Sequence, residues 1–158
     1  MNKISAFASS FIALWFWSGK MPKAPGTWGS LAALPFAWGL TVYFGTPHVL
    51  LLSAAILLPI GVWASNLHSE KIGKHDAGEI VVDEVVGQWI ALSVAPYSIL
   101  GWCAAFILFR FFDIIKPWPI GWIDKRVSGG WGIMLDDVVA GLFAALCVWG
   151  LWNFVGDF

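Results

Sequence analysis

The chain has 158 residues, of which 59% are hydrophobic and only 12% are charged. Soluble domains carry about 25% charged residues, so this composition argues against a water-soluble domain and predicts an integral membrane protein. No basic patch accompanies the net charge of −1, and no nucleic-acid partner is expected. The twelve tryptophans suit a protein at the boundary between lipid and water, where the indole ring is favoured.

The N-terminal segment is apolar from Ile4 to Trp17 and is preceded by Lys3. A secretory signal would end in a small-residue cleavage site, and Gly19-Lys20-Met21 does not provide one. We therefore expect a retained helix that lies at the membrane interface or enters the membrane halfway.

Five further apolar stretches are candidate membrane spans. A bilayer core is about 30 Å thick and requires roughly 20 apolar residues in a helix. The sequence thus predicts an all-α fold, a polytopic membrane helical bundle that forms one membrane-embedded domain over residues 1–158. The expected spans run from Gly29 to Phe44, His48 to Ala64, Ile80 to Ala95, Ile99 to Ile115, and Ile133 to Phe154.

Charged residues are concentrated in three of the five connections that join the N-terminal segment and these five stretches. The loops near Gly45 and near Pro96 carry no charge, whereas the other three contain nearly all the lysines and arginines. With five spans, the charged connections fall on one side, which the positive-inside rule makes cytoplasmic. Topology alone would account for the lysines, but carboxylates contribute little to orientation and need another explanation.

Acidic residues gather where the third stretch begins, between His75 and Gly87. Asp76, Glu79 and Asp83 are spaced three and four apart, so a helix would place them on one stripe. Glu84 would lie about a quarter turn away. Such acids repel one another unless a cation intervenes, and acids within a membrane are usually functional. A solvated first turn would explain Asp76 and Glu79, but not Asp83 and Glu84.

A second acidic pair, Asp136-Asp137, follows a glycine-rich segment from Gly129 to Gly132. Glycines permit a tight turn and a close approach of the backbone, and the pair then opens or enters the last helix, from Val138 to Phe154. N-capping by Asp136 is the simpler explanation. A cap needs only one acid, however, and the apolar residues just before the pair indicate that it lies at membrane depth.

Arg110, Asp113 and Lys116 are three residues apart and are expected to share one helical face. Pro117 ends this helix, because the residue before a proline is pushed out of helical geometry. Arg110 and Asp113 could form a self-contained ion pair beside a snorkelling Lys116. Alternatively, Arg110 or Lys116 binds phosphate oxygens, which a guanidinium group contacts in bidentate fashion.

The segment from Lys23 to Ser30 contains a Pro-Gly turn at the start of the first span. Backbone N–H groups at a helix N-terminus suit an anion, so Gly26 and Thr27 are candidate phosphate contacts. Pro-Gly is also common in ordinary turns, so this segment alone does not establish a phosphate site.

These four stretches, in this order, resemble the phosphatidylglycerophosphatase A family. The resemblance extends over nearly the whole chain between about Pro25 and Gly141. It implies magnesium-dependent removal of the terminal phosphate of phosphatidylglycerophosphate, giving phosphatidylglycerol at the bacterial cytoplasmic (inner) membrane. A membrane phospholipid would then be the substrate, and the lipid bilayer the surroundings. The matching residues are Pro25 to Ser30, His75 to Gly87, Arg110 with Asp113 to Pro119, and Gly129 to Gly141.

The chemistry of the side chains predicts their roles at such a site. Mg²⁺ prefers carboxylates, water and phosphate oxygens, so the expected metal ligands are Asp83, Glu84, Asp136 and Asp137. The number of ions, the nucleophile (water or an aspartate) and the oligomeric state stay open. The remaining candidates are Arg110, Lys116, Thr27 and Gly26 for phosphate binding, Asp113 in support, and Asp76, Glu79, His75 and Asp83 for catalysis.

Two other classes of protein fit parts of the pattern. An ion-coupled or proton-coupled transporter would use intramembrane acids and an arginine, but the acids gather at one edge and have no counterpart opposite. A non-catalytic membrane subunit would pair its acids and its arginine internally. A cysteine phosphatase does not fit, because Cys103 and Arg110 are separated by six residues within an apolar stretch, not by five around a phosphate loop.

Overall fold

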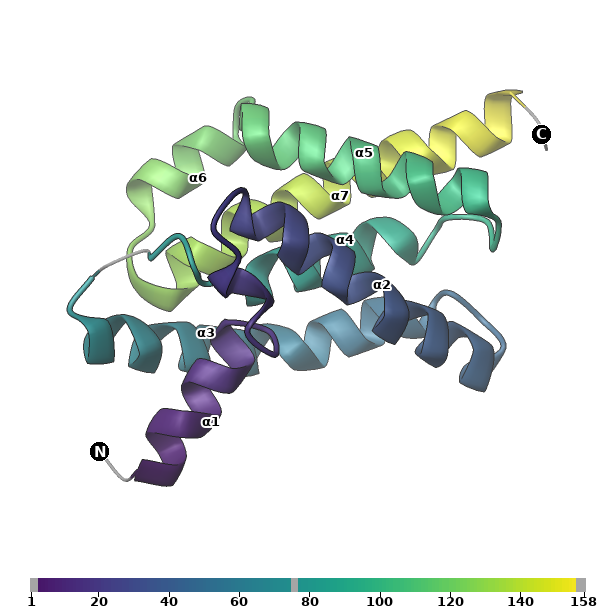
Figure 1. Ribbon diagram of the computed structural model, residues 1–158. Helices are drawn as coiled ribbons and strands as arrows, with labels where there is room; N and C mark the ends of the chain where they lie inside the picture. Colours follow the sequence, from purple (N-terminus) through teal and green to yellow (C-terminus); the bar gives the residue numbers. More distant parts are fainter. Residues whose placement is uncertain (1–2, 75–76, 156–158) are drawn as a thin grey trace.

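The computed structural model describes residues 3–74 and 77–155 of the chain. Within these residues the fold consists of seven α-helices and one short 3₁₀ turn, with no strand, so the all-α prediction is confirmed (Figure 1). The elements are α1 (Lys3–Ala13), η1 (Ser18–Lys20), α2 (Pro25–Phe44), α3 (Val49–Ile72), α4 (Val82–Leu92), α5 (Ile99–Ile115), α6 (Ile120–Arg126) and α7 (Gly129–Val155).

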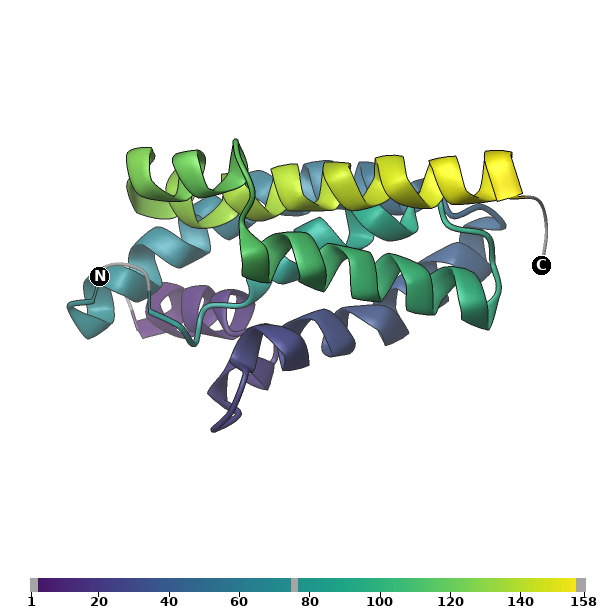
Figure 2. The same ribbon diagram turned by 90° about the horizontal axis from the view of Figure 1, so that it is seen from above.

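Helix α4 occupies the centre of the bundle. It packs against α2, α3, α5 and α7, and every residue from Val85 to Leu92 is buried. Seen from above, α5 and α7 run alongside each other over its length, and α2 flanks it on another side (Figure 2). The surrounding helices therefore shield α4 almost completely, and even the polar side chain of Gln88 is buried. A helix that is apolar on most of its faces is expected to be buried in this way.

All five predicted stretches form helices, and α5 has the predicted bounds. Two helices, α3 and α7, are long and apolar enough to cross a membrane by length and composition. The third stretch contains a shorter helix than expected, since the 11 residues of α4 span only about 16 Å. Its flanks, residues 77–81 and 93–98, are partly buried and non-helical, and an apolar composition does not distinguish such segments from helix.

The charged connections lie together at one end of the bundle, as the sequence predicts. The start of α2, the end of α3, the α5–α6 connection and the start of α7 lie toward this end in Figure 1, whereas the uncharged α2–α3 and α4–α5 connections lie at the other. One connection contains a helix that the sequence did not predict, α6. It follows Pro119 and anchors Ile120 in the core.

Helices α4 and α7 approach each other closely at a pair of glycines. A Cβ atom on Gly141 would collide with the backbone of Gly87, and one on Gly87 would collide with Phe109 and the carbonyl oxygen of Asp137. The small-residue spacing noted in the sequence thus brings helices together within the chain. Asp83 precedes Gly87 by four residues, and Asp137 precedes Gly141 by four. Both acids therefore lie about one helical turn N-terminal to the glycine contact.

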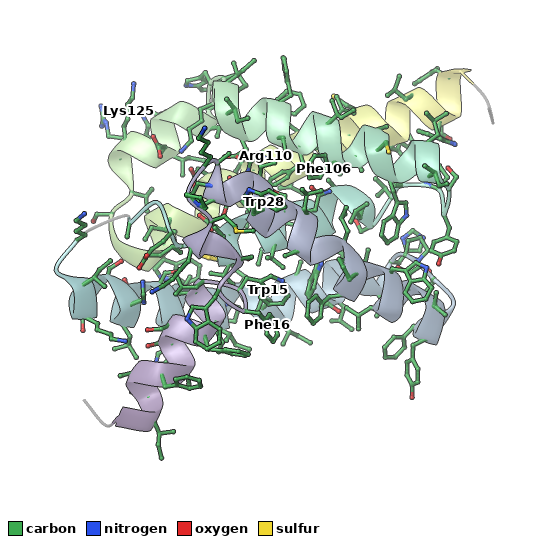
Figure 3. The ribbon with its side chains drawn as sticks, in the orientation of Figure 1. Trp15, Phe16, Trp28, Phe106, Arg110 and Lys125 are labelled. Atoms are coloured by element: carbon green, nitrogen blue, oxygen red, sulfur yellow. The ribbon has the colours of Figure 1, made fainter. Side chains whose placement is uncertain are left out.

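The N-terminal segment braces the start of α4. The carbonyl oxygen of Ala13 accepts a hydrogen bond from the Val81 amide at 2.9 Å, and Trp15 packs edge-on against Trp89 of α4. Trp15 and Phe16 lie between α1 and α2, where both rings contact Phe36 (Figure 3). The backbone between α1 and η1 is left-handed at three successive aromatic residues, an unusual conformation that this packing maintains.

Candidate active site

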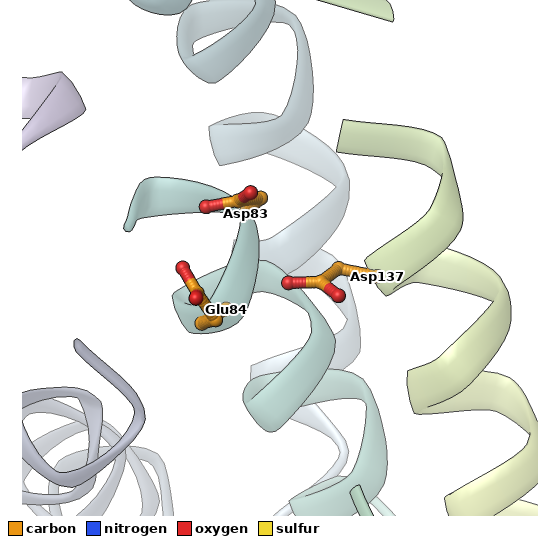
Figure 4. A group of neighbouring side chains, drawn as sticks. All are labelled: Asp83, Glu84 and Asp137. Carbon is orange, nitrogen blue, oxygen red and sulfur yellow. The ribbon is translucent and has the colours of Figure 1, made fainter. Parts of the chain in front are cut away.

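Three carboxylates from two helices converge at the charged end of the bundle. Asp83 and Glu84 lie in the first turn of α4, and Asp137 faces them from α7 (Figure 4). One carboxylate oxygen from each residue lies within 4.8 Å of the other two. All three are among the four metal ligands expected from the sequence, and an ion could bridge them.

The local sequence explains how each acid reaches this position. Asp83 and Glu84 lie at the N-terminus of α4, where the helix dipole favours negative charge. Helix α7 begins at Gly129, so Asp136 and Asp137 lie in its third turn. N-capping by Asp136 is therefore wrong as an explanation of the pair.

The start of α7 is fixed by packing on α3. The amide of Gly130 donates a 2.6 Å hydrogen bond to the side-chain oxygen of Asn66. A Cβ on Gly130 would collide with the Val62 carbonyl oxygen, so the glycine permits a contact that sets the register of the acidic pair. The sequence analysis did not single out Asn66.

Several carboxylate oxygens at the site lack a partner. Asp83 Oδ1, Glu84 Oε2 and Asp136 Oδ1 are buried and have no hydrogen bond within the described part of the chain. Buried polar atoms are nearly always hydrogen-bonded, and an unpaired buried charge is costly. Hard oxygen donors of this kind are the ligands that Mg²⁺ and Ca²⁺ take, so the donor set fits a divalent cation.

Asp136, the fourth predicted ligand, is turned toward a lysine. Lys116 Nζ donates to Asp136 Oδ2 at 2.7 Å and to Asp124 Oδ1 at 2.6 Å. Burial alone would lower the pKa of Lys116, but the two carboxylates outweigh it and raise the pKa. Lys116 is thus a fixed cation at the edge of the site. The sequence analysis missed Asp124 because it treated the segment containing α6 as a charged loop.

Arg110 lies beside Glu84, at the edge of the carboxylate cluster. Its Nη1 is 2.5 Å from Asp113 Oδ2 and 3.7 Å from Glu84 Oε1, and it donates to Ser30 Oγ at 3.4 Å. The ion pair with Asp113 considered in the sequence analysis is present, but it is not self-contained, because Glu84 belongs to the carboxylate cluster. The same explanation from the sequence had Lys116 snorkelling toward water, but Lys116 is paired with two acids.

The Pro-Gly segment at the start of α2 contributes through Gly26. A Cβ on this residue would collide with Glu84 and press on Arg110 Nη1, so only glycine allows α2 to approach the pair so closely. Thr27 differs, because its amide is used within the first turn of α2, where it donates to the Ala24 carbonyl oxygen at 3.0 Å. The structure brings Gly26, but not Thr27, to the acidic cluster.

Glu79 lies apart from the cluster. It precedes α4 and is not helical, so the expected helical stripe through Glu79 and Asp83 is wrong. Its Oε1 is 2.8 Å from Nε2 of the buried His68, whose Nδ1 contacts Ser10 Oγ at 3.0 Å. This network ties the segment before α4 to α3 and α1. The two remaining predicted catalytic residues, His75 and Asp76, lie outside the described residues.

The acids and Lys116 enclose a polar cavity of about 200 Å³. Its wall includes all four predicted ligands together with Asp113 and Asp124, and it also contains glycines at positions 78, 129 and 132 and three apolar residues. The fold and the site together define a helical, membrane-associated protein with a carboxylate centre that could hold a metal ion.

Comparison with known proteins specifies the family. Residues 11–152 match the phosphatidylglycerophosphatase A family. Phosphatidylglycerophosphatase A of Escherichia coli K12 is 43% identical over 146 residues, covering 92% of this chain and 81% of the relative. The Haemophilus influenzae Rd protein of the same name is 41% identical over 141 residues, covering 89% and 86%. The chain therefore belongs to the phosphatidylglycerophosphatase A family.

A Bacteroides thetaiotaomicron VPI-5482 protein, provisionally named a phosphatidylinositol-3-phosphatase, is 37% identical over 154 residues, covering 92% of this chain and 94% of the relative. No solved structure matches the chain significantly.

Proposed function

We propose that the protein is a magnesium-dependent lipid phosphatase that converts phosphatidylglycerophosphate into phosphatidylglycerol for phospholipid biosynthesis. The observation that carries the proposal is the convergence of Asp83, Glu84 and Asp137 beside Lys116 and Arg110 in a member of this family. Acids that share a cation next to fixed positive groups suit metal-assisted hydrolysis of a phosphate monoester.

Asp83, Glu84 and Asp137 would hold the Mg²⁺ ion, with Asp136 at the edge of the site. A bound divalent cation would neutralise phosphate charge and would lower the pKa of the water that it coordinates. The three acids come from two helices that are locked together at Gly87 and Gly141. Their spacing is therefore set by the fold, which is the pre-organisation that charge stabilisation requires.

Lys116 and Arg110 would bind the substrate phosphate. A lysine ammonium has three donors, and Asp124 and Asp136 account for two hydrogen bonds of Lys116. A third donor can reach a phosphate oxygen without breaking either bond. Asp113 holds the Arg110 guanidinium beside Glu84, where its positive charge stabilises negative charge on the transferring phosphoryl group.

Among the predicted catalytic acids, Asp83 is the one whose position best supports a role in proton transfer. It lines the cavity and carries an unpartnered oxygen, whereas Glu79 is engaged by His68. We assign proton transfer to Asp83 and a positioning role to Glu79. His75 and Asp76, which come shortly before Glu79 in the chain, stay candidates for general base, and water or an aspartate stays the candidate nucleophile.

We further propose five membrane crossings, with the site at the cytoplasmic face. Helices α2, α3, α5 and α7 would each cross, and the fifth crossing would combine α4 with its flanks. Non-helical backbone at membrane depth is tolerated where protein buries it, and both flanks of α4 contain buried residues. The clustering of charged connections at the site end supports the orientation.

The test is phosphate release by the purified protein in detergent. With phosphatidylglycerophosphate and Mg²⁺ we expect inorganic phosphate and phosphatidylglycerol, and no turnover after chelation. Phosphatidylinositol 3-phosphate serves as the competing substrate, because one relative carries that activity in its name. A higher kcat/KM for the inositol lipid would replace the proposed substrate, and no turnover with any divalent metal would remove the enzymatic proposal.

A further inference from the structure

A large apolar groove separates α2 from α5 and lies outside the carboxylate cluster. It encloses about 600 Å³. Both helices pack on α4 but make few direct contacts with each other, so the space between them stays open. The groove is lined by Leu31, Leu34, Trp38, Tyr97, Ser98, Ile99, Trp102, Cys103, Phe106 and Ile107.

One end of the groove meets the candidate active site. Arg110 of α5 donates to Ser30 of α2 at 3.4 Å, which links the two helices beside Glu84. Leu34 lies one turn beyond Ser30, and Phe106 lies one turn before Arg110, so each groove residue shares a helical face with a residue at the site. The groove therefore begins where the polar site ends (Figure 3 labels Arg110 and Phe106).

The groove is long enough to hold much of a lipid acyl chain. Ile99 lies eleven positions before Arg110, a distance of roughly 16 Å along the helix. The hydrocarbon of a single leaflet is about half of the 30 Å core. The end of the groove farther from Arg110 is formed by Tyr97 and Ser98, in the connection before α5.

Several apolar residues of the lining are exposed, as are apolar residues elsewhere on the surface of the bundle. Trp38 is 57% exposed and Ile107 is 64% exposed, and Cys103 is also exposed. Lipid in the bilayer would cover an outward-facing residue, but a concave groove that starts at a phosphate site suits a specific chain. Its length, its apolar lining and its continuity with Arg110 all favour an acyl chain of the lipid whose headgroup occupies the site.

We propose that the groove between α2 and α5 binds one acyl chain of the substrate and so positions the phosphate against Arg110 and the carboxylates. The proposal rests on the lipid phosphatase function proposed above. It makes the protein selective for phosphate esters that carry a long chain, because burying methylene groups in the groove contributes binding energy that a deacylated headgroup lacks.

The test compares two substrates in the same detergent micelles. One is dipalmitoyl phosphatidylglycerophosphate, and the other is its deacylated headgroup, glycerophosphoglycerophosphate. Cys103→Trp fills the groove, and Ile56→Trp is the matched control because Ile56 is 57% exposed on α3, away from the groove. The quantity measured is kcat/KM for the long-chain substrate divided by kcat/KM for the headgroup.

We expect this ratio to fall by about tenfold or more in Cys103→Trp, as when roughly two chain methylenes lose their burial. The Ile56→Trp variant should keep the wild-type ratio. An unchanged ratio in Cys103→Trp would overturn the acyl-chain proposal, even if phosphate release confirms the enzyme. Failure of the wild-type protein to hydrolyse either substrate would instead overturn the underlying function.

A labelling experiment on the wild-type protein keeps the proposal testable if Cys103→Trp misfolds. Phosphatidylglycerophosphate with a photoreactive group midway along one chain should crosslink to the groove residues of α2, from Leu31 to Trp38, and of α5, from Ile99 to Ile107. Mass spectrometry maps the labelled residues. Excess unlabelled lipid should suppress this labelling. Labels confined to other helices, or to a second copy of the chain, would overturn the assignment.

Discussion

At the scale of single residues, the site consists of acids held closer together than their charges favour. Asp83, Glu84 and Asp137 are largely buried, and oxygens of Asp83 and Glu84 have no partner among the described residues. Repulsion between such groups destabilises the fold unless a cation or a proton neutralises them. The residues that serve the reaction are thus expected to cost stability in the absence of metal.

Asp83→Asn and Asp137→Asn are each expected to reduce phosphate release by roughly 100-fold or more, because each removes a ligand that fixes the ion. Both variants should raise the unfolding temperature measured in chelator, because a repulsive charge is gone. Glu70→Gln, which alters an exposed acid on α3, is the control and should leave both quantities unchanged. Near-normal turnover in either aspartate variant would show that its carboxylate is not a ligand.

Lys116 tests the phosphate-binding side of the site. Lys116→Met leaves Asp124 and Asp136 without their shared cation, and we expect it to reduce kcat/KM by roughly 100-fold and to lower the unfolding temperature. Lys116→Arg keeps the charge and should retain more activity than the methionine variant. Equal activity in the two variants would mean that the charge at this position is not used.

At the scale of elements, the contact between α4 and α7 determines the spacing of the acids. Gly87 and Gly141 let the two backbones touch one turn away from Asp83 and Asp137. Neither glycine bears any chemistry of its own. A change at either position should therefore reach the site through helix separation, without altering the ligands themselves.

Gly141→Ala should lower the free energy of unfolding by about 1–3 kcal/mol, since the added methyl group meets the backbone of Gly87. Gly150→Ala in the same helix is the matched control, because a Cβ there meets nothing within 4 Å. The control should be neutral or stabilising by about 0.5–1 kcal/mol, since alanine favours the helix. Denaturant titration in detergent and phosphate release measure both effects, and equal behaviour of the two variants would rule out the proposed contact.

At the scale of the whole molecule, periodicity and composition suffice for the helical class, for α5 and for the end at which charges gather. They do not reveal that α4 is short, because its non-helical flanks are also rich in apolar residues. Asp83, Glu84 and Asp137 were recognisable as acids inside apolar stretches. Asp124 was not, since its contact with Lys116 depends on how α6 folds back, which only tertiary packing decides.

The central claim is that acids from α4 and α7 share one divalent cation. The most direct test is isothermal titration of Mg²⁺ into the purified protein in detergent, without lipid, for the wild type, Asp83→Asn and Asp137→Asn. The account predicts saturable binding to the wild type and its loss in both variants, although the changes lie on different helices. Binding of equal strength in all three proteins would contradict a shared ion.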